Sequence, residues 1–239
     1  MARKRPDEAG VVSQVKNPEL VHTRRRQIVD ASVHLFIEKG FHKTPTRRIA
    51  EAVGFSIGSL YEYVSSKDDV LYLVCDAIHD EIETGIHRDI AREKQGLAGL
   101  EAAIGVYIRV CDTMADHLQL IYQETASLSK KWRRRVLDSE VRITNIFVER
   151  IEQAVDEGTL APMEPSSVEL LAHTIMVIGH MWAFRRWFLK GRYTLEGYIA
   201  FQTRFILAAA REGGAPSAGS GTGPDPHAGN PSSMHWRQP

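Results

Sequence analysis

The chain has 239 residues, 43% of them hydrophobic and 25% charged, with 30 Lys and Arg against 30 Asp and Glu. This length can hold one large domain or two modest ones with a substantial core. The start of the chain is basic and polar without an apolar stretch behind it, which argues against a signal peptide. The longest apolar run, Ile175 to Phe184, is interrupted and too short to cross a bilayer. Cys75 and Cys111 lack metal-site spacing. We therefore expect a cytoplasmic protein with reduced thiols and no membrane segment.

The neutral total hides an uneven distribution of charge. Residues 1–67 carry 12 Lys and Arg against 7 Asp and Glu, whereas the remaining residues carry 18 against 23. A basic first part and an acidic remainder would confine the attraction for phosphate to one end of the molecule. The run Arg24–Arg25–Arg26 alone is typical of a solvated helix face, so it indicates nucleic acid only beside a DNA-binding motif.

Short helical patterns dominate the first part of the chain. Residues 1–20 are polar and charged, and we predict a disordered arm there. Apolar spacing then predicts a helix from Thr23 to Lys39, ended by Gly40. Two short helical patterns follow, Thr46 to Val53 and Ser56 to Val64.

The two short patterns are typical of a DNA-binding helix-turn-helix. Thr46 is a suitable N-cap for the first helix, and Gly54 tolerates the left-handed conformation that ends it. The second helix opens with small residues, which let a recognition helix approach the DNA major groove closely. We expect Ile57, Leu60 and Val64 on its inner side.

The segment from Thr44 to Val70, TPTRRIAEAVGFSIGSLYEYVSSKDDV, resembles the DNA-binding signature of the TetR/AcrR family of bacterial transcriptional regulators. The resemblance covers about Thr23 to Val70; Glu62 and Val64 depart from the usual pattern and bear on which DNA sequence is read. It implies a three-helix head that binds double-stranded DNA. We expect phosphate contacts from Arg47, Arg48, Tyr61, Tyr63 and Lys67, and base-edge contacts from Thr46, Ser56, Ile57, Gly58 and Ser59.

The rest of the chain reads as helices without strand-like alternation. A long helix from about Lys67 carries an apolar stripe through Ile86. Ser166 and Ser167 are candidate caps of a later helix. Further helices are predicted over about 97–115, 117–128, 131–157, 166–190 and 194–211.

We therefore predict an all-α fold with an N-terminal helix-turn-helix domain and a C-terminal helical ligand-binding and dimerisation domain. The tail is rich in Gly, Pro and Ser and cannot bury enough apolar surface to fold. The predicted boundaries are a disordered arm (1–20), the DNA-binding domain (21–67), the effector-binding and dimerisation domain (68–212) and a disordered tail (213–239).

The segment from Ile175 to Phe184 is apolar almost all round and needs cover on nearly every side. A second copy of the chain would provide part of that cover, and the resemblance implies a four-helix dimer interface made by the last two helices. Two recognition helices related by a two-fold axis would read a palindrome that one short helix cannot select. We therefore expect a homodimer. Repression is preferred over activation, because blocking a promoter sterically needs no extra contact surface.

The resemblance also implies a small apolar or amphipathic inducer among the middle helices. The segment from Trp182 to Tyr198 is similar to family members that regulate fatty-acid or acyl-CoA catabolism. The basic run from Lys130 to Arg135, with Arg185, Arg186 and Trp187, could hold the phosphates of an acyl-CoA, although a solvated basic face is the better interpretation of the run from Lys130 to Arg135. No cofactor is expected beyond this effector. Candidate lining residues, each also explained by ordinary core packing, are Tyr107, Met114, Tyr122, Phe147, Met176 and Trp182.

Two other classes of protein stay open. An architectural DNA-binding protein would lack an effector, but about 140 ordered residues beyond the head exceed what dimerisation requires. A metal-dependent helical enzyme would depend on His173 and His180, with Glu124 or His117, yet residues seven apart lie about 10 Å apart along a helix. The sequence shows none of the nucleophile, phosphate-loop or zinc-protease motifs, so we expect no enzyme.

Overall fold

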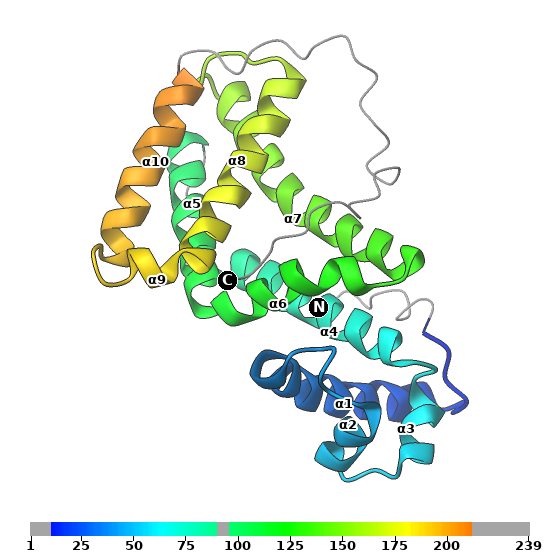
Figure 1. The fold of residues 1–239 in the computed structure, drawn as a ribbon. Helices are drawn as coiled ribbons and strands as arrows, with labels where there is room; N and C mark the ends of the chain where they lie inside the picture. The colour runs from blue at the N-terminus through cyan, green and yellow to red at the C-terminus, as the bar shows by residue number, and fades with distance from the viewer. Residues whose placement is uncertain (1–10, 90–95, 212–239) are drawn as a thin grey trace. The chain divides into compact units, whose positions relative to one another are not determined.

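The computed structural model describes residues 11–89 and 96–211, and within these ranges every regular element is helical, which confirms the all-α fold (Figure 1). The chain divides into two compact units: unit 1 is Met1–Glu81 with Gln119–Val136, and unit 2 is Ile82–Leu118 with Leu137–Pro239. In chain order the elements are α1 (Pro18–Lys39), α2 (Thr46–Val53), α3 (Ile57–Tyr63), α4 (Lys67–Asp89), α5 (Gly96–Thr113), α6 (Ala115–Glu124), the 3₁₀ turn η1 (Thr125–Ser127), α7 (Lys130–Asp156), α8 (Pro165–Phe184), α9 (Arg186–Leu189) and α10 (Leu195–Arg211).

The first helix begins earlier than the apolar spacing predicts. The Asn17 side chain caps it by accepting hydrogen bonds from the backbone N–H groups of Glu19 and Leu20, at 3.1 and 3.2 Å. Pro18 then supplies a helical φ at the first position. The prediction of a disordered arm over 1–20 is therefore wrong for its last part, while residues 1–10 lie outside the described residues.

Three helices form the predicted DNA-binding head in unit 1, around the buried side chains of Ile28, Phe36, Ile49 and Leu60. The chain leaves α2 at Gly54 with φ +78°, as predicted for a glycine in the left-handed region. The predicted N-cap is wrong, because Pro45 precedes the helix and Thr46 is its first residue.

A tryptophan fixes the start of α7 within unit 1. The Trp132 ring stacks on Tyr72 with centroids 4.1 Å apart, and its indole N–H donates to Asp69 at 2.9 Å. Lys131 lies 4.0 Å above the same ring. The basic run from Lys130 to Arg135 is therefore built around a buried aromatic anchor that joins α7 to α4.

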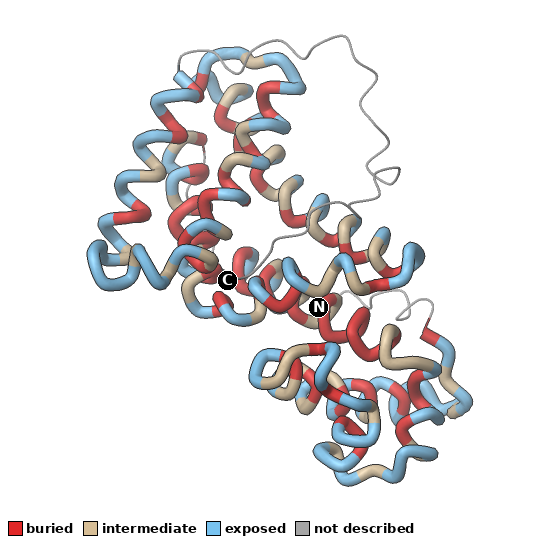
Figure 2. The backbone as a smooth tube through the Cα atoms, in the orientation of Figure 1, coloured by how far each residue is buried: buried red, intermediate tan, exposed pale blue. Residues whose placement is uncertain are grey.

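Unit 2 is built on the contact of α5 with α8, with α10 packed against both helices. Gly179 allows the close approach: a Cβ there would lie 2.4 Å from a Tyr107 ring carbon and 2.9 Å from the Cys111 sulfur. Two buried tyrosine hydroxyls donate to carbonyls of α8, Tyr107 to Met176 at 3.4 Å and Tyr198 to Ile178 at 2.8 Å. Figure 2 shows the buried residues as red segments along these helices.

The second half of the chain differs from prediction at helix ends. The helix predicted to run to residue 190 ends at Phe184, and α9 follows as a single turn. Glu164 precedes α8, so Ser166 and Ser167 lie inside it rather than capping it. The apolar run predicted to be too short for a bilayer belongs to this 20-residue helix, which by length and composition is long and apolar enough for a membrane span, and half of that stretch is buried. The predicted tail lies outside the described residues.

Candidate DNA-binding site

The recognition helix α3 is capped and anchored by its own short sequence. The Ser56 hydroxyl accepts from the backbone N–H of Ser59 at 3.0 Å, which satisfies a first-turn donor. Leu60 and Val64 are buried, as predicted, and hold the helix on the head. The inner position predicted for Ile57 is wrong, because its side chain is 44% exposed.

The residues predicted to read bases form the outer part of α3 and its approach. Ser56, Ile57 and Gly58 are exposed, Ser59 is half-buried, and Thr46 on α2 lies 3.2 Å from Tyr61, hydroxyl to hydroxyl. At Gly58 an added Cβ would have the Ser56 hydroxyl, 3.7 Å away, as its nearest neighbour. The space beside Gly58 is therefore open, and the base edges on the floor of a DNA groove could occupy it.

The residues predicted to contact phosphate fall into two groups. Arg47 and Arg48 are exposed on α2, and Arg47 donates to Glu51 at 3.0 Å within the helix. Tyr61 is 38% exposed, whereas the Tyr63 ring is buried beside Phe55, with centroids 6.1 Å apart. Arg47, Arg48 and Tyr61 are therefore accessible to DNA, and most of Tyr63 is not.

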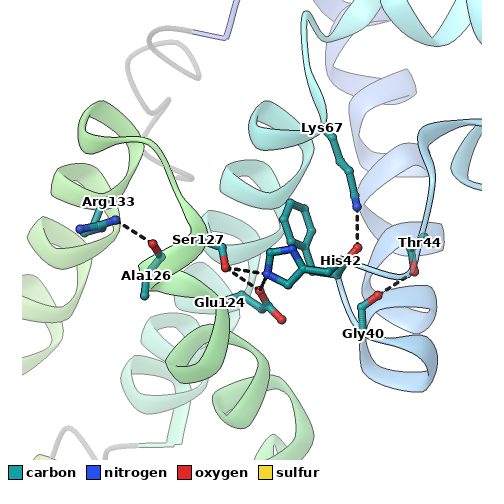
Figure 3. A network of polar contacts seen from close by, with 9 residues as sticks. Gly40, His42, Thr44, Lys67, Glu124, Ala126, Ser127 and Arg133 are labelled. Carbon is teal, nitrogen blue, oxygen red and sulfur yellow. Dashed lines mark hydrogen bonds and ion pairs between the residues drawn. The ribbon is translucent and has the colours of Figure 1, made fainter. Parts of the chain in front are cut away.

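Lys67, the last predicted phosphate contact, has a partner within the chain. Its ammonium group donates to the Phe41 carbonyl and lies 4.2 Å above the Phe41 ring (Figure 3). Partial burial lowers its pKa, and the nearby Glu124 carboxylate opposes that shift. The charge thus holds the connection between α1 and α2, and its contact with phosphate stays a prediction.

A polar network lies on the same connection between α1 and α2, and the helical periodicity of the sequence does not predict it. The His42 ring nitrogen Nε2 lies 3.1 Å from the Ser127 hydroxyl and 3.6 Å from the Glu124 carboxylate. The Ser127 hydroxyl donates to Glu124 at 3.0 Å. Figure 3 shows these side chains bringing the end of α6 and η1 to the loop that enters α2. The partners are more than 80 residues apart in sequence, which local patterns do not reveal.

The predicted effector residues lie in several places. In unit 2, the Tyr107 and Phe147 rings meet edge to face at 5.3 Å, next to Met176. Trp182 is buried with its ring 4.9 Å from that of Tyr198 on α10, centroid to centroid, and its indole N–H donates to Asp112 at 2.8 Å. Met114 and Tyr122 differ in burial and unit, the first buried in unit 2 and the second 72% exposed in unit 1.

The candidate metal ligands of the enzyme alternative fall in different units. Glu124 lies in the polar network of unit 1, while His173 is exposed on α8 and His180 packs near Phe184 in unit 2. Across the described ranges, no three His, Cys, Asp or Glu side chains are grouped to hold a metal ion.

Sequence comparisons agree with this architecture. The profile described as "Bacterial regulatory proteins, tetR family" matches residues 28–72, and "Tetracyclin repressor-like, C-terminal domain" matches residues 93–209. The transcriptional regulator HbdR from Aromatoleum sp. (strain CIB) is 34% identical over 189 residues, which cover 79% of this chain and 81% of HbdR. The chain belongs to the TetR family of bacterial transcriptional regulators.

Two other proteins add to the comparison. The transcriptional repressor KstR2 from Mycobacterium tuberculosis (strain ATCC 25618 / H37Rv) is 25% identical over 182 residues, covering 72% of this chain and 84% of KstR2. The crystal structure of AibR in complex with isovaleryl coenzyme A and operator DNA superposes with a TM-score of 0.62 at 20% identity, covering 76% of this chain and 97% of AibR. The TetR assignment makes the chain a DNA-binding regulator and not an enzyme.

Proposed function

We propose that this TetR-family regulator is a cytoplasmic homodimeric repressor of a palindromic operator, released by a small amphipathic effector. The observation that carries the proposal is the exposed row of small residues on a capped, anchored α3 beside two exposed arginines of α2. Small side chains allow the helix to enter the major groove, and the arginines can hold the flanking phosphates.

An exposed apolar surface supports dimerisation through α8 and α10. On α10, Phe201 and Phe205 are 60% and 59% exposed, one helical turn apart. Val177 and Met181 on α8 are 42% and 37% exposed with the same spacing. Faces of this kind in a soluble protein are typical of an interface. Two recognition helices about 34–36 Å apart would then read both halves of a palindrome.

We infer that the effector is an acyl-CoA. Tyr107, Phe147 and Met176 gather aromatic and apolar groups suited to an acyl chain. Near α9, the guanidinium of Arg185 lies 5.0 Å from the Trp187 ring, beside an exposed aromatic surface suited to a nucleotide and its phosphates. AibR, a structural neighbour, was crystallised with isovaleryl coenzyme A.

The His42 network gives the effector signal a physical route to the DNA-binding head. Residues 119–136 belong to the same compact unit as the head, and α6 and α7 continue from them into unit 2. A displacement of these helices would be transmitted to the loop before α2 by the contacts of His42 with Glu124 and Ser127. The coupling free energy expected for such a link is about 1–3 kcal/mol, or roughly 5–150-fold in affinity.

The test is a titration of the protein–operator complex. Operator DNA would be selected from a random library, and binding measured by fluorescence anisotropy with acyl-CoAs of increasing chain length, free coenzyme A and free fatty acids. We expect selective, palindromic DNA binding and release by one range of acyl-CoAs only. Equal binding to all DNA sequences would favour an architectural protein, and release by none of the acyl-CoAs would refute this effector class.

A variant pair tests the route itself. His42→Ala should reduce the effect of the acyl-CoA on DNA affinity while leaving effector binding intact, and His22→Ala, at an exposed position of α1, is the matched control. An unchanged coupling in His42→Ala would place the route elsewhere.

A further inference from the structure

The connection from α3 to α4 is only three residues long, and a buried carboxylate organises it. Asp69, in the first turn of α4, is 7% exposed. Its Oδ2 atom accepts a hydrogen bond from the backbone N–H of Ser65 at 2.9 Å, and its own backbone N–H donates to the Ser66 hydroxyl at 3.1 Å. This reciprocal pair is similar to a capping box, which satisfies the free N–H groups where a helix begins. Asp69 therefore fixes how the chain leaves α3 and enters α4.

The other oxygen of the same carboxylate is held by α7. The Asp69 Oδ1 atom accepts from the indole N–H of Trp132 at 2.9 Å. The Trp132 ring is buried and stacked on Tyr72, so the direction of its N–H is fixed by packing. One residue earlier, Asp68 accepts from the backbone N–H of Ser129 at 3.2 Å, which ties the start of α7 to the same turn. A buried carboxylate oxygen without a donor is costly, so the indole N–H keeps Asp69 in the orientation that organises the connection.

The C-terminal end of α3 is held by contacts from outside the helix. The helix has seven residues, and the last carbonyls of a helix lack partners within it. Arg25 of α1, which is 4% exposed, donates to the Tyr63 carbonyl at 3.0 Å. The Ser65 N–H, two residues further on, is held by Asp69. Because only Val64 separates these two contacts, a rotation of the Asp69 carboxylate would displace the end of α3.

We propose that Trp132 is a positioning residue for the recognition helix: through Asp69, its indole N–H fixes the turn after α3 and thereby the angle at which α3 enters the major groove. The proposal rests on the placement of α3 in the major groove under the proposed function. Contacts with base edges need hydrogen-bond geometry and weaken steeply when it is lost, whereas attraction to phosphate falls off slowly with distance. Selectivity for the operator should therefore depend on Trp132, and binding to DNA of any sequence should not.

The variant Trp132→Phe tests this role in the full-length protein. It removes the indole N–H, keeps an aromatic ring against Tyr72 and changes no charge. Fluorescence anisotropy would give its affinity for the selected operator and for a random-sequence duplex of equal length. We expect operator binding to weaken about tenfold, the scale of one hydrogen bond to a charged group. Binding to the random duplex should be unchanged, because it depends on phosphate charge.

Hydrogen exchange tests the physical link directly. Followed by mass spectrometry over residues 60–70, exchange should be faster in Trp132→Phe than in the wild type, because the hydrogen bond that protects the Ser65 N–H is weakened. Unchanged exchange in this segment would overturn the link between Trp132 and the turn after α3.

A core truncation and a double variant separate positioning from lost stability. Ile151→Ala removes a fully buried side chain nineteen residues further along α7, so it should lower the melting temperature and leave selectivity between the two duplexes unchanged. Asp69→Asn leaves one acceptor oxygen for two donors, so it should reduce selectivity. Because Trp132 acts through Asp69, adding Trp132→Phe to Asp69→Asn should cause little further loss.

The outcomes separate this role from the proposed function. Unchanged selectivity in a folded Trp132→Phe variant, or an equal loss of affinity for both duplexes, would overturn the positioning role and leave the proposed function standing. Additive losses in the double variant, or the same loss of selectivity in Ile151→Ala, would do so too. If the wild-type protein binds no duplex selectively, the proposed function fails and the positioning role fails with it.

Discussion

A carboxylate introduced on the outer face of α3 should abolish DNA binding while leaving folding intact. In Ser59→Glu the backbone N–H of residue 59 keeps its hydrogen bond to the Ser56 hydroxyl, because only the side chain changes. Glutamate at this third helical position completes a capping box, and an anion in the first turn is worth about 0.3–1 kcal/mol of helix stability. We therefore expect helicity, dimerisation and melting temperature to match or exceed those of the wild type.

Binding to the operator should be lost in the same variant. With α3 in the major groove, the new carboxylate would lie about 5 Å from a phosphate, which costs about 3 kcal/mol at an effective dielectric constant of 20. That energy corresponds to about a hundredfold in affinity for each half-site. Fluorescence anisotropy on the selected operator measures the loss.

The uncharged variant Ser59→Gln is the control for size and capping. It has nearly the same shape as Ser59→Glu and also suits the capping box, so it should bind far better than the carboxylate variant. Equal operator affinity of Ser59→Glu and Ser59→Gln would refute the placement of α3 in the groove.

Three further outcomes follow from the packing. Gly58→Ala has room within the chain, so it should leave thermal stability unchanged or higher yet weaken operator binding; unaltered affinity would mean that no DNA approaches this position. Phe205→Asp should convert the dimer to monomers in light scattering, whereas Val141→Glu, also at an exposed apolar site, should not. Burial raises the pKa of the Cys111 thiol to about 12, and Cys75 is fully buried. Neither should react with Ellman's reagent near neutral pH before unfolding, so rapid labelling would contradict the packing.

The helices of the chain could be predicted where one local signal dominates. The apolar stripe of α4 and the glycines that end α1 and α2 give the element and its boundary together. Helix boundaries without such a signal could not be predicted from apolar spacing. The helix α1 begins at Pro18 because Asn17 caps it ahead of the apolar spacing. The helix α8 ends at Phe184 although the apolar and basic pattern of the sequence continues.

The outer residues of the head could be predicted from the sequence, whereas its internal polar contacts could not. Ser56, Gly58 and the arginines of α2 stand exposed where the motif places them. In contrast, Arg25 reads as one of three outward arginines but is buried, since its partners are carbonyls from distant parts of the chain. Lys67 reads as a phosphate contact and yet binds the Phe41 carbonyl, which only the folded head brings near.

The division into units bears on how a regulator of this kind can respond to an effector. The C-terminal family profile covers residues 93–209, but residues 119–136 belong to the compact unit of the DNA-binding head. Trp132 stacked on Tyr72, and Glu124 beside His42, tie this segment to α4 and to the loop before α2. An effector that shifts α6 or α7 in unit 2 therefore acts on helices whose other ends are part of the head. Under the proposed function, an effector with different affinities for two positions of α6 and α7 would shift the equilibrium between these positions by its differential affinity, and that shift would change how α3 meets DNA.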